Sequence, residues 1–240
     1  MEVYNGNKSP VIKIDNRIMK NKKIVIIGGS SGIGLNLAKH LLKLGAQVLI
    51  ASRKENNLKK AKVELGDKIE IHVLDAKNEA SVIDFFSQIG DFDHLVTTIK
   101  HDHVNSPFSS GDTKAAQNGF NNKFWGQYYC AKHCLSSISN NGSIILTSGI
   151  ASNQAYSGFS TTAAINGAIE SLVKTLAVEL APIRINAVSP GFVERFPNDK
   201  DRLESVKKIE PTLKRLITLD EITKVYISLL EDSSRTGKIL

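Results

Sequence analysis

Short continuous apolar runs alternate with amphipathic segments along most of the chain. Runs rich in Val, Ile and Leu are typical of strands buried on both faces of a parallel sheet. They fall at 24–28, 48–52, 69–74, 94–98, 143–147 and 183–188. Between them, apolar residues at helical spacing predict helices over 32–44, 56–65, 79–89, 112–138, 160–181 and 220–230.

This alternation of strand and helix predicts an α/β fold. We expect one Rossmann-like, doubly wound parallel sheet with helices on both faces, because parallel neighbours need helical crossovers. The polar stretch 1–21 is interpreted as an extension, and the domain as 22–240. In such a fold, ligands bind at the carboxyl ends of the strands.

Composition narrows the class of protein without changing the fold. Of the 240 residues, 41% are hydrophobic and 23% charged, which excludes a disordered chain or a coiled coil. No apolar run suits a membrane span or a signal peptide, and two cysteines form neither a disulfide framework nor a metal set. The sequence therefore predicts a cytoplasmic protein without a metal. The net charge of +7 is spread out, and we interpret it as a basic surface and not as a nucleic-acid site.

The first strand runs directly into a glycine-rich turn and then into a helix. The turn reads Gly28-Gly29-Ser30-Ser31-Gly32-Ile33-Gly34. Glycines allow a tight turn and close approach of backbone to a pyrophosphate, and the helix N-terminus offers free N–H groups. The alternative is a tight turn without a ligand. The predicted dinucleotide contacts are Gly28, Ser30, Ser31, Gly32, Ile33 and Gly34.

The spacing of this turn resembles the T-G-x-x-x-G-I-G turn of the short-chain dehydrogenase/reductase family. Ile183–Gly191 is similar to that family's I-R-V-N-x-V-x-P-G, and Leu176–Glu179 to its L-A-x-E. The resemblance covers the chain from about residue 22. It implies hydride transfer between a nicotinamide and a carbonyl carbon, with a mobile lid over about 192–215. Further cofactor contacts implied by the resemblance are Asp75, Thr97, Thr98, Pro190, Gly191 and Val193. Arg195 stands where the family has a threonine, and it could reach the pyrophosphate instead.

The end of the second strand favours the phosphorylated cofactor. An acidic residue there would bind the ribose 2′-hydroxyl of NAD, but residues 51–54 contain no carboxylate. Ser52 can donate to a 2′-phosphate and Arg53 can pair with it. The sequence therefore predicts NADP(H), with Arg53 as a solvated loop cation being the alternative.

The expected catalytic residues depart from the family pattern. Ser148, at a strand end, matches the serine that orients the carbonyl, whereas the family's Tyr and Lys positions fall on Thr162 and Asn166. Neither is suited to acid–base work. Lys123 stands where the family has an asparagine, so we expect Lys123 and Asn166 to have exchanged places and Lys123 to supply the charge. The alternatives are a one-residue slip to Asn122, a solvent-facing Lys123, and a Lys123 that pairs with Asp112 or with a cofactor phosphate. Other candidate proton sources are Tyr156, His101 and His103.

Taken together, these features predict an NADP(H)-dependent oxidoreductase acting on a small carbonyl or alcohol substrate, and the basic residues of 196–215 favour an anionic one. Two alternatives remain open: an NADP(H)-binding sensor without redox turnover, and a non-redox lyase or isomerase on the same fold. A homodimer through the helices at 112–138 and 160–181 is expected, and the last strand, at Thr236–Leu240, is cut short.

Overall fold

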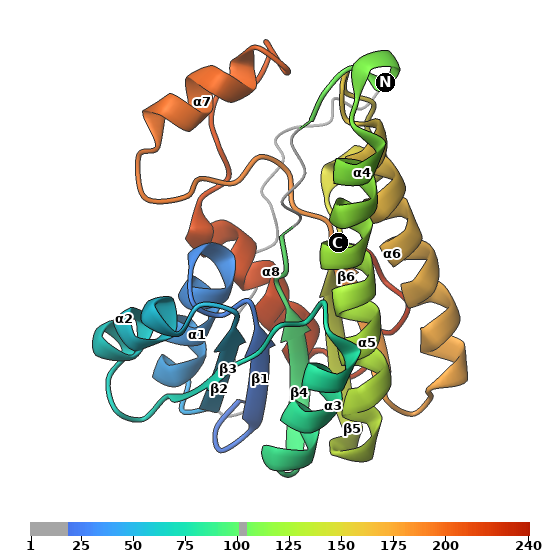
Figure 1. Cartoon of the computed structure of the whole chain (residues 1–240). Coiled ribbons are helices and arrows are strands. Elements are labelled where there is room, and N and C mark those ends of the chain that lie inside the picture. Colours follow the sequence, from blue (N-terminus) through green and yellow to red (C-terminus); the bar gives the residue numbers. More distant parts are fainter. Residues whose placement is uncertain (1–18, 101–104) are drawn as a thin grey trace, which may run out of the picture.

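Six parallel strands form the single sheet of this protein, in a computed structural model that describes residues 19–100 and 105–240 (Figure 1). The strand order is β3-β2-β1-β4-β5-β6, and each strand is parallel to its neighbours. The strands are β1 (Lys23–Ile27), β2 (Gln47–Ser52), β3 (Glu70–Val73), β4 (Phe92–Thr97), β5 (Ile138–Thr147) and β6 (Arg184–Val188). The predicted doubly wound architecture is confirmed. The candidates His101 and His103 lie outside the described residues.

Helices cover both faces of the sheet, as continuous apolar strands require. One apolar core lies under α1, α2 and α8, and the other under α3, α5 and α6. The helices are α1 (Gly32–Lys43), α2 (Glu55–Leu65), α3 (Glu79–Gln88), α4 (Thr113–Phe120), α5 (Gly126–His133), α6 (Ser160–Glu179), α7 (Lys200–Lys207) and α8 (Leu219–Glu231).

The strand register places the candidate site at one edge. β1 lies between β2 and β4, with Ile27 paired to Ala51 and to Thr97. The chain leaves β1 and β4 toward opposite sides of the sheet, so the turn after β1 opens at the topological switch point. The glycine-rich turn and the residues after β4 therefore meet there.

The helix predicted over 112–138 is interrupted. Between α4 and α5 lies a π-helical turn, Asn121–Trp125, and β5 already begins at Ile138. A π turn carries an extra residue, and such turns are frequent at functional sites. The interruption changes which side chains face α6: Asn122 and Lys123 are both buried here.

The C-terminal segment continues the sheet beyond β6 by backbone hydrogen bonds. Gly237 N–H donates to the Ile185 carbonyl at 2.7 Å, and Leu240 N–H to the Ala187 carbonyl at 3.0 Å. Ala187 and Ile239 form an isolated parallel bridge. The short final strand thus pairs with the edge of β6 without extending into a full strand.

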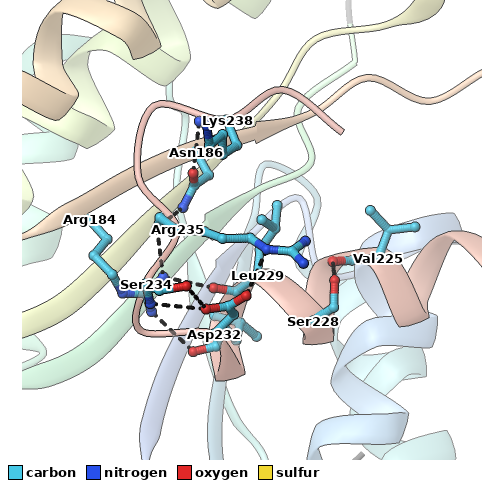
Figure 2. A network of polar contacts seen from close by, with 10 residues as sticks. Arg184, Asn186, Val225, Ser228, Leu229, Asp232, Ser234, Arg235 and Lys238 are labelled. Atoms are coloured by element: carbon cyan, nitrogen blue, oxygen red, sulfur yellow. Dashed lines mark hydrogen bonds and ion pairs between the residues drawn. The ribbon is translucent and has the colours of Figure 1, made fainter. Parts of the chain in front are cut away.

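A buried arginine joins β6 to the end of α8 and to this segment (Figure 2). Arg184 donates to the carbonyls of Leu229 at 2.9 Å, Leu230 at 3.1 Å and Arg235 at 3.2 Å. Asn186 donates to the Arg235 carbonyl and accepts from the backbone of Lys238. A cation that satisfies the last carbonyls of a helix also complements its dipole.

The domain begins earlier than 22. Met19 is 1% exposed and packs in the core under α1, and Asn21 N–H donates to the Gly45 carbonyl at 3.0 Å. None of the helices in the described part of the chain combines the length and the apolar character of a membrane span.

Candidate active site

The glycine-rich turn after β1 is packed so closely that side chains cannot be added. A Cβ on Gly28, whose φ is +89°, would lie 2.8 Å from Thr98 Oγ1, and one on Gly34 would lie 2.6 Å from the Gly28 carbonyl oxygen. Thr98 donates its backbone N–H to the Ile27 carbonyl at 2.7 Å and its hydroxyl to the Gly28 carbonyl at 3.2 Å. The predicted contact Thr98 therefore supports the turn from β4.

The turn presents the beginning of α1 to the site. Ser31 is exposed as the N-cap residue, its side chain makes no cap hydrogen bond, and the first turn of α1 has no acidic residue. Gly32 has a φ of +54°, and the side chains of Ser30 and Ile33 are half-buried beside it. Free N–H groups at a positive helix end, with no competing carboxylate in that turn, suit a phosphate.

The end of β2 carries an unmet donor. The Ser52 hydroxyl is buried and has no hydrogen-bond partner within residues 19–100 and 105–240. Arg53 follows it with an exposed side chain, and residues 51–54 bring no carboxylate. Buried polar groups are rarely left unpaired. An unpaired hydroxyl next to a cation, with no acidic group, fits a bound 2′-phosphate better than a ribose hydroxyl.

Two other predicted cofactor contacts differ in their placement. Asp75, after β3, is half-buried and accepts from the backbone of Lys77 at 3.2 Å, at the same edge as the turn. Thr97 is 0% exposed and donates to Gln127 of α5 at 2.5 Å. The structure does not support a cofactor contact by the Thr97 side chain, because its hydroxyl is turned into the core.

The loop after β6 is held by backbone contacts. The Pro190 carbonyl accepts from Ile150 at 3.0 Å, Gly191 follows it, and Val193 is bridged to Ile217. Arg195 departs from its predicted role. Its guanidinium donates to both carboxylate oxygens of Asp199, at 2.7 and 2.8 Å, and does not stand free for a pyrophosphate.

Lys123 reaches α6 from the π turn, as the exchange hypothesis expects. Its Nζ lies 2.7 Å from Asn166 Oδ1 and 2.6 Å from the Ser148 carbonyl oxygen. Asn166 in turn donates to the Gly149 carbonyl at 3.1 Å. The side chains of Lys123 and Asn166 are buried, at 6% and 2% exposure. The solvent-facing alternative for Lys123 is thus contradicted.

Burial changes the pKa of the Lys123 ammonium. Desolvation lowers the pKa of Lys123 to about 8, and the carboxylate of Glu170 acts in the opposite direction. An ammonium has three hydrogens, and two of them have acceptors among the described residues. A lysine with this pKa exchanges a proton near neutral pH, which an exposed lysine does not.

The Ser148 hydroxyl faces α6. It donates to Glu170 Oε1 at 2.8 Å, Ser152 donates to the same oxygen at 2.6 Å, and Ser148 is 3% exposed. A hydroxyl has one hydrogen, so in this arrangement Ser148 cannot also donate to a substrate carbonyl. The structure does not support the predicted role of its side chain. Its backbone carbonyl instead positions Lys123.

Thr162 and Tyr156 complete the set of predicted candidates. Thr162 is buried and donates to Asn105 at 2.7 Å, which fits its expected lack of acid–base function. Tyr156 stacks edge-on against Phe192 and donates to Gln154 at 2.5 Å. Desolvation and Glu210 raise the pKa of Tyr156, which makes it a weaker acid.

Sequence reasoning missed Glu170 and Gln127, which hold the site from two helices. Gln127 donates to the Lys123 carbonyl at 3.2 Å and to the Thr147 carbonyl at 3.0 Å, and is 0% exposed. Glu170 follows Asn166 by one helical turn, and this spacing was a usable signal. Tyr128 and Lys132 have the Tyr-x-x-x-Lys spacing, but Lys132 pairs with Glu79 on the outside of α5.

Nearly the whole chain is similar to known oxidoreductases. The family model described as enoyl-(acyl carrier protein) reductase matches residues 28–240. A short-chain dehydrogenase/reductase of Stachybotrys chlorohalonatus, ATR9, is 30% identical over 92% of this chain and 95% of its own. These matches include the glycine turn and the loop after β6.

Solved structures agree with this comparison. A small-chain dehydrogenase in complex with NADPH is 31% identical, with a TM-score of 0.74, over 92% of this chain and 96% of that chain. The MalC reductase/Diels-Alderase of Malbranchea aurantiaca is 26% identical, with a TM-score of 0.82, over 94% and 95% of the two chains.

Proposed function

Since the chain belongs to the short-chain dehydrogenase/reductase family, we propose that it is an NADP(H)-dependent oxidoreductase with Lys123 as its proton donor. The substrate is a small carbonyl compound or the corresponding alcohol. The basic segment 196–215 favours a substrate that carries negative charge.

One observation carries the proposal: a buried lysine stands where the π turn between α4 and α5 faces α6. Lys123 is fixed by Asn166 and by the Ser148 carbonyl, and it keeps one hydrogen for a further acceptor. When bound, NADPH supplies a hydride, and the cofactor carries that chemistry. The protein holds a proton at Lys123 Nζ. This ammonium stabilises the negative charge that develops on the carbonyl oxygen of the substrate.

The cofactor preference rests on three features described above. The glycine turn excludes side chains, α1 begins without an acidic residue, and Ser52 presents an unpaired hydroxyl next to Arg53. Together they suit the pyrophosphate and the 2′-phosphate of a phosphorylated dinucleotide.

Steady-state kinetics of Lys123→Met test the proposal. We expect turnover with an accepted aldehyde, ketone, quinone or imine to fall by about 10²–10⁴-fold, while the NADPH dissociation constant changes little. Thr162→Ala is the matched control, because it removes a buried polar group at the position of the family tyrosine. Unchanged turnover in Lys123→Met would show that the proton comes from elsewhere.

A second candidate function is NADP(H) binding without turnover. The hydroxyls of Ser148 and Thr162 are both committed to internal acceptors, which leaves Lys123 as the polar group available to a substrate in this cluster of described residues. A wild-type protein that binds NADPH but oxidises it with none of these substrate classes supports this candidate instead.

A further inference from the structure

Lys100 occupies an unusual place at the candidate site. It follows β4 directly, and its Nζ lies 3.7 Å from the point where a Cβ on Gly32 would stand. Its side chain is exposed and makes no hydrogen bond or ion pair with a carboxylate among the described residues. An ammonium therefore lies over the glycine turn without a counter-charge from that part of the chain.

Other cations surround Lys100. Arg202 and Arg195 both repel its charge, and with desolvation, the largest contribution, they lower the pKa of Lys100. The Arg202 side chain, on α7, donates to the Val193 carbonyl at 2.5 Å. Two carboxylates act on this group: Arg195 engages both oxygens of Asp199, and the charge of Asp201 also acts on Arg195. Three cations and two carboxylates leave an excess of one positive charge.

We propose that Lys100 is a cofactor-binding residue that contacts the pyrophosphate of NADP(H), with Arg202 as the second cation facing that group. This inference rests on the proposed function. A pyrophosphate diester carries two negative charges, and the cluster has an excess of positive charge with which it can pair. Its position also fits, because Gly32 begins α1 and the N–H groups there suit the same anion.

The pyrophosphate explains the arrangement better than an anionic substrate does. Lys100 approaches Gly32 of the turn, whereas the proton donor Lys123 lies with Asn166 on α6. Charge-assisted contacts of this kind are strong because donor and acceptor are both ionised. The repulsion of Lys100 by Arg202 and Arg195 is offset when an anion binds beside Lys100.

Equilibrium binding tests the assignment with two probes, NADPH and adenosine 2′-monophosphate, which lacks the pyrophosphate. In Lys100→Met, we expect NADPH to bind about tenfold more weakly, the loss of one charge-assisted contact. The affinity for adenosine 2′-monophosphate should stay unchanged. Salt should weaken NADPH binding less in the variant than in the wild type, because fewer exposed charges are screened.

Lys43→Met is the matched control, since it removes one exposed lysine from the opposite end of α1. Lys100→Arg should retain wild-type NADPH affinity. Equal NADPH affinity in Lys100→Met and wild type overturns the inference, and so does an equal loss for both probes. A wild-type protein that binds neither NADPH nor NADH contradicts the proposed function itself and is recognised before any variant is compared.

Discussion

At the scale of single side chains, the proposed preference for NADP(H) depends on Ser52 and Arg53. The position after β2 brings a hydroxyl and a guanidinium, and no carboxylate, to the adenosine end of the proposed site. A carboxylate there would repel a 2′-phosphate and accept from a ribose hydroxyl. The identity of one side chain thus selects between the two dinucleotides.

We therefore expect Arg53→Asp to invert the preference from NADPH to NADH. The dissociation constants of both cofactors, measured by fluorescence titration, give the ratio directly. Arg53→Met separates loss of the cation from gain of a carboxylate and should weaken NADPH alone. A wild-type protein with equal affinity for the two cofactors would contradict the assignment.

Substitutions at Asn166 and at Glu170 should shift the pKa of Lys123 in opposite directions. Below a pKa of about 8 the ammonium is protonated and can donate, so reduction should be lost as pH rises through that value. Asn166→Asp places a carboxylate beside Nζ, which favours the charged form and shifts this loss to higher pH. Glu170→Gln removes a charge that raises the pKa, so the loss should shift to lower pH.

The pH dependence of turnover at saturating NADPH measures both shifts. Glu170→Gln retains an oxygen that accepts from Ser148 and Ser152, which separates the change of charge from the loss of the hydrogen bonds. Profiles of both variants that coincide with that of the wild type would show that Lys123 does not titrate in the catalytic step.

At the scale of elements, Arg184, the first residue of β6, links that strand to α8 and to the C-terminal segment (Figure 2). Arg184→Met leaves the carbonyls of Leu229, Leu230 and Arg235 without this donor. We expect the free energy of unfolding in urea to fall by about 3 kcal/mol, since these bonds are charged and buried. The NADPH dissociation constant of the folded protein should not change.

Arg235→Met is the control for this prediction. The Arg235 side chain is half-exposed and pairs with Asp232 at 2.7 Å, a surface ion pair worth less than about 1 kcal/mol. An equal loss in both variants would mean that the carbonyl contacts of Arg184 contribute nothing beyond a surface charge.

The order and kind of elements could be predicted from the sequence, whereas the π turn could not. The spacing of apolar residues predicts the strands and helices, because each segment must carry apolar side chains on the faces that it buries. The turn at Asn121–Trp125 and α4 both pack on α6, a contact between segments far apart in the sequence that residue type alone does not reveal. The contact between Lys123 and Asn166 was predictable from position alone, because the fold fixes the segments that carry them.

Side-chain direction was the part that the sequence left undetermined. Ser148 and Thr97 stand at strand ends where the resemblance places site residues, yet their hydroxyls donate to Glu170 and Gln127. Acceptors on neighbouring helices decide which way a strand-end hydroxyl turns. Those acceptors are distant in sequence, so position relative to a motif does not reveal them.

For the molecule as a whole, NADPH should be a stabilising ligand. The proposed contacts come from the ends of β1, β2 and β4 and from α7, and a ligand that binds only the folded state adds stability by mass action. At a hundredfold excess over its dissociation constant, NADPH should add about 2.7 kcal/mol to the free energy of unfolding. Thermal unfolding followed with NADPH and with NADH at equal concentration checks this. An unshifted melting temperature at millimolar NADPH contradicts the cofactor assignment.

Dimerisation through the outer faces of α4, α5 and α6 stays a prediction. These helices cover one face of the sheet (Figure 1). Sedimentation of the purified protein would measure the assembly directly.

The π turn makes the chemistry of this site depend on residue count as well as on residue identity. Its extra residue sets whether Lys123 or the adjacent Asn122 stands opposite Asn166. With α5 held in place, the loss of a single residue between Lys123 and α5 would bring Asn122 into the lysine's position. A cationic pocket would then become a neutral amide pair, although no residue at 122, 123 or 166 had been substituted. A change in length could therefore alter this protein's reaction where a comparison of side chains would find nothing changed.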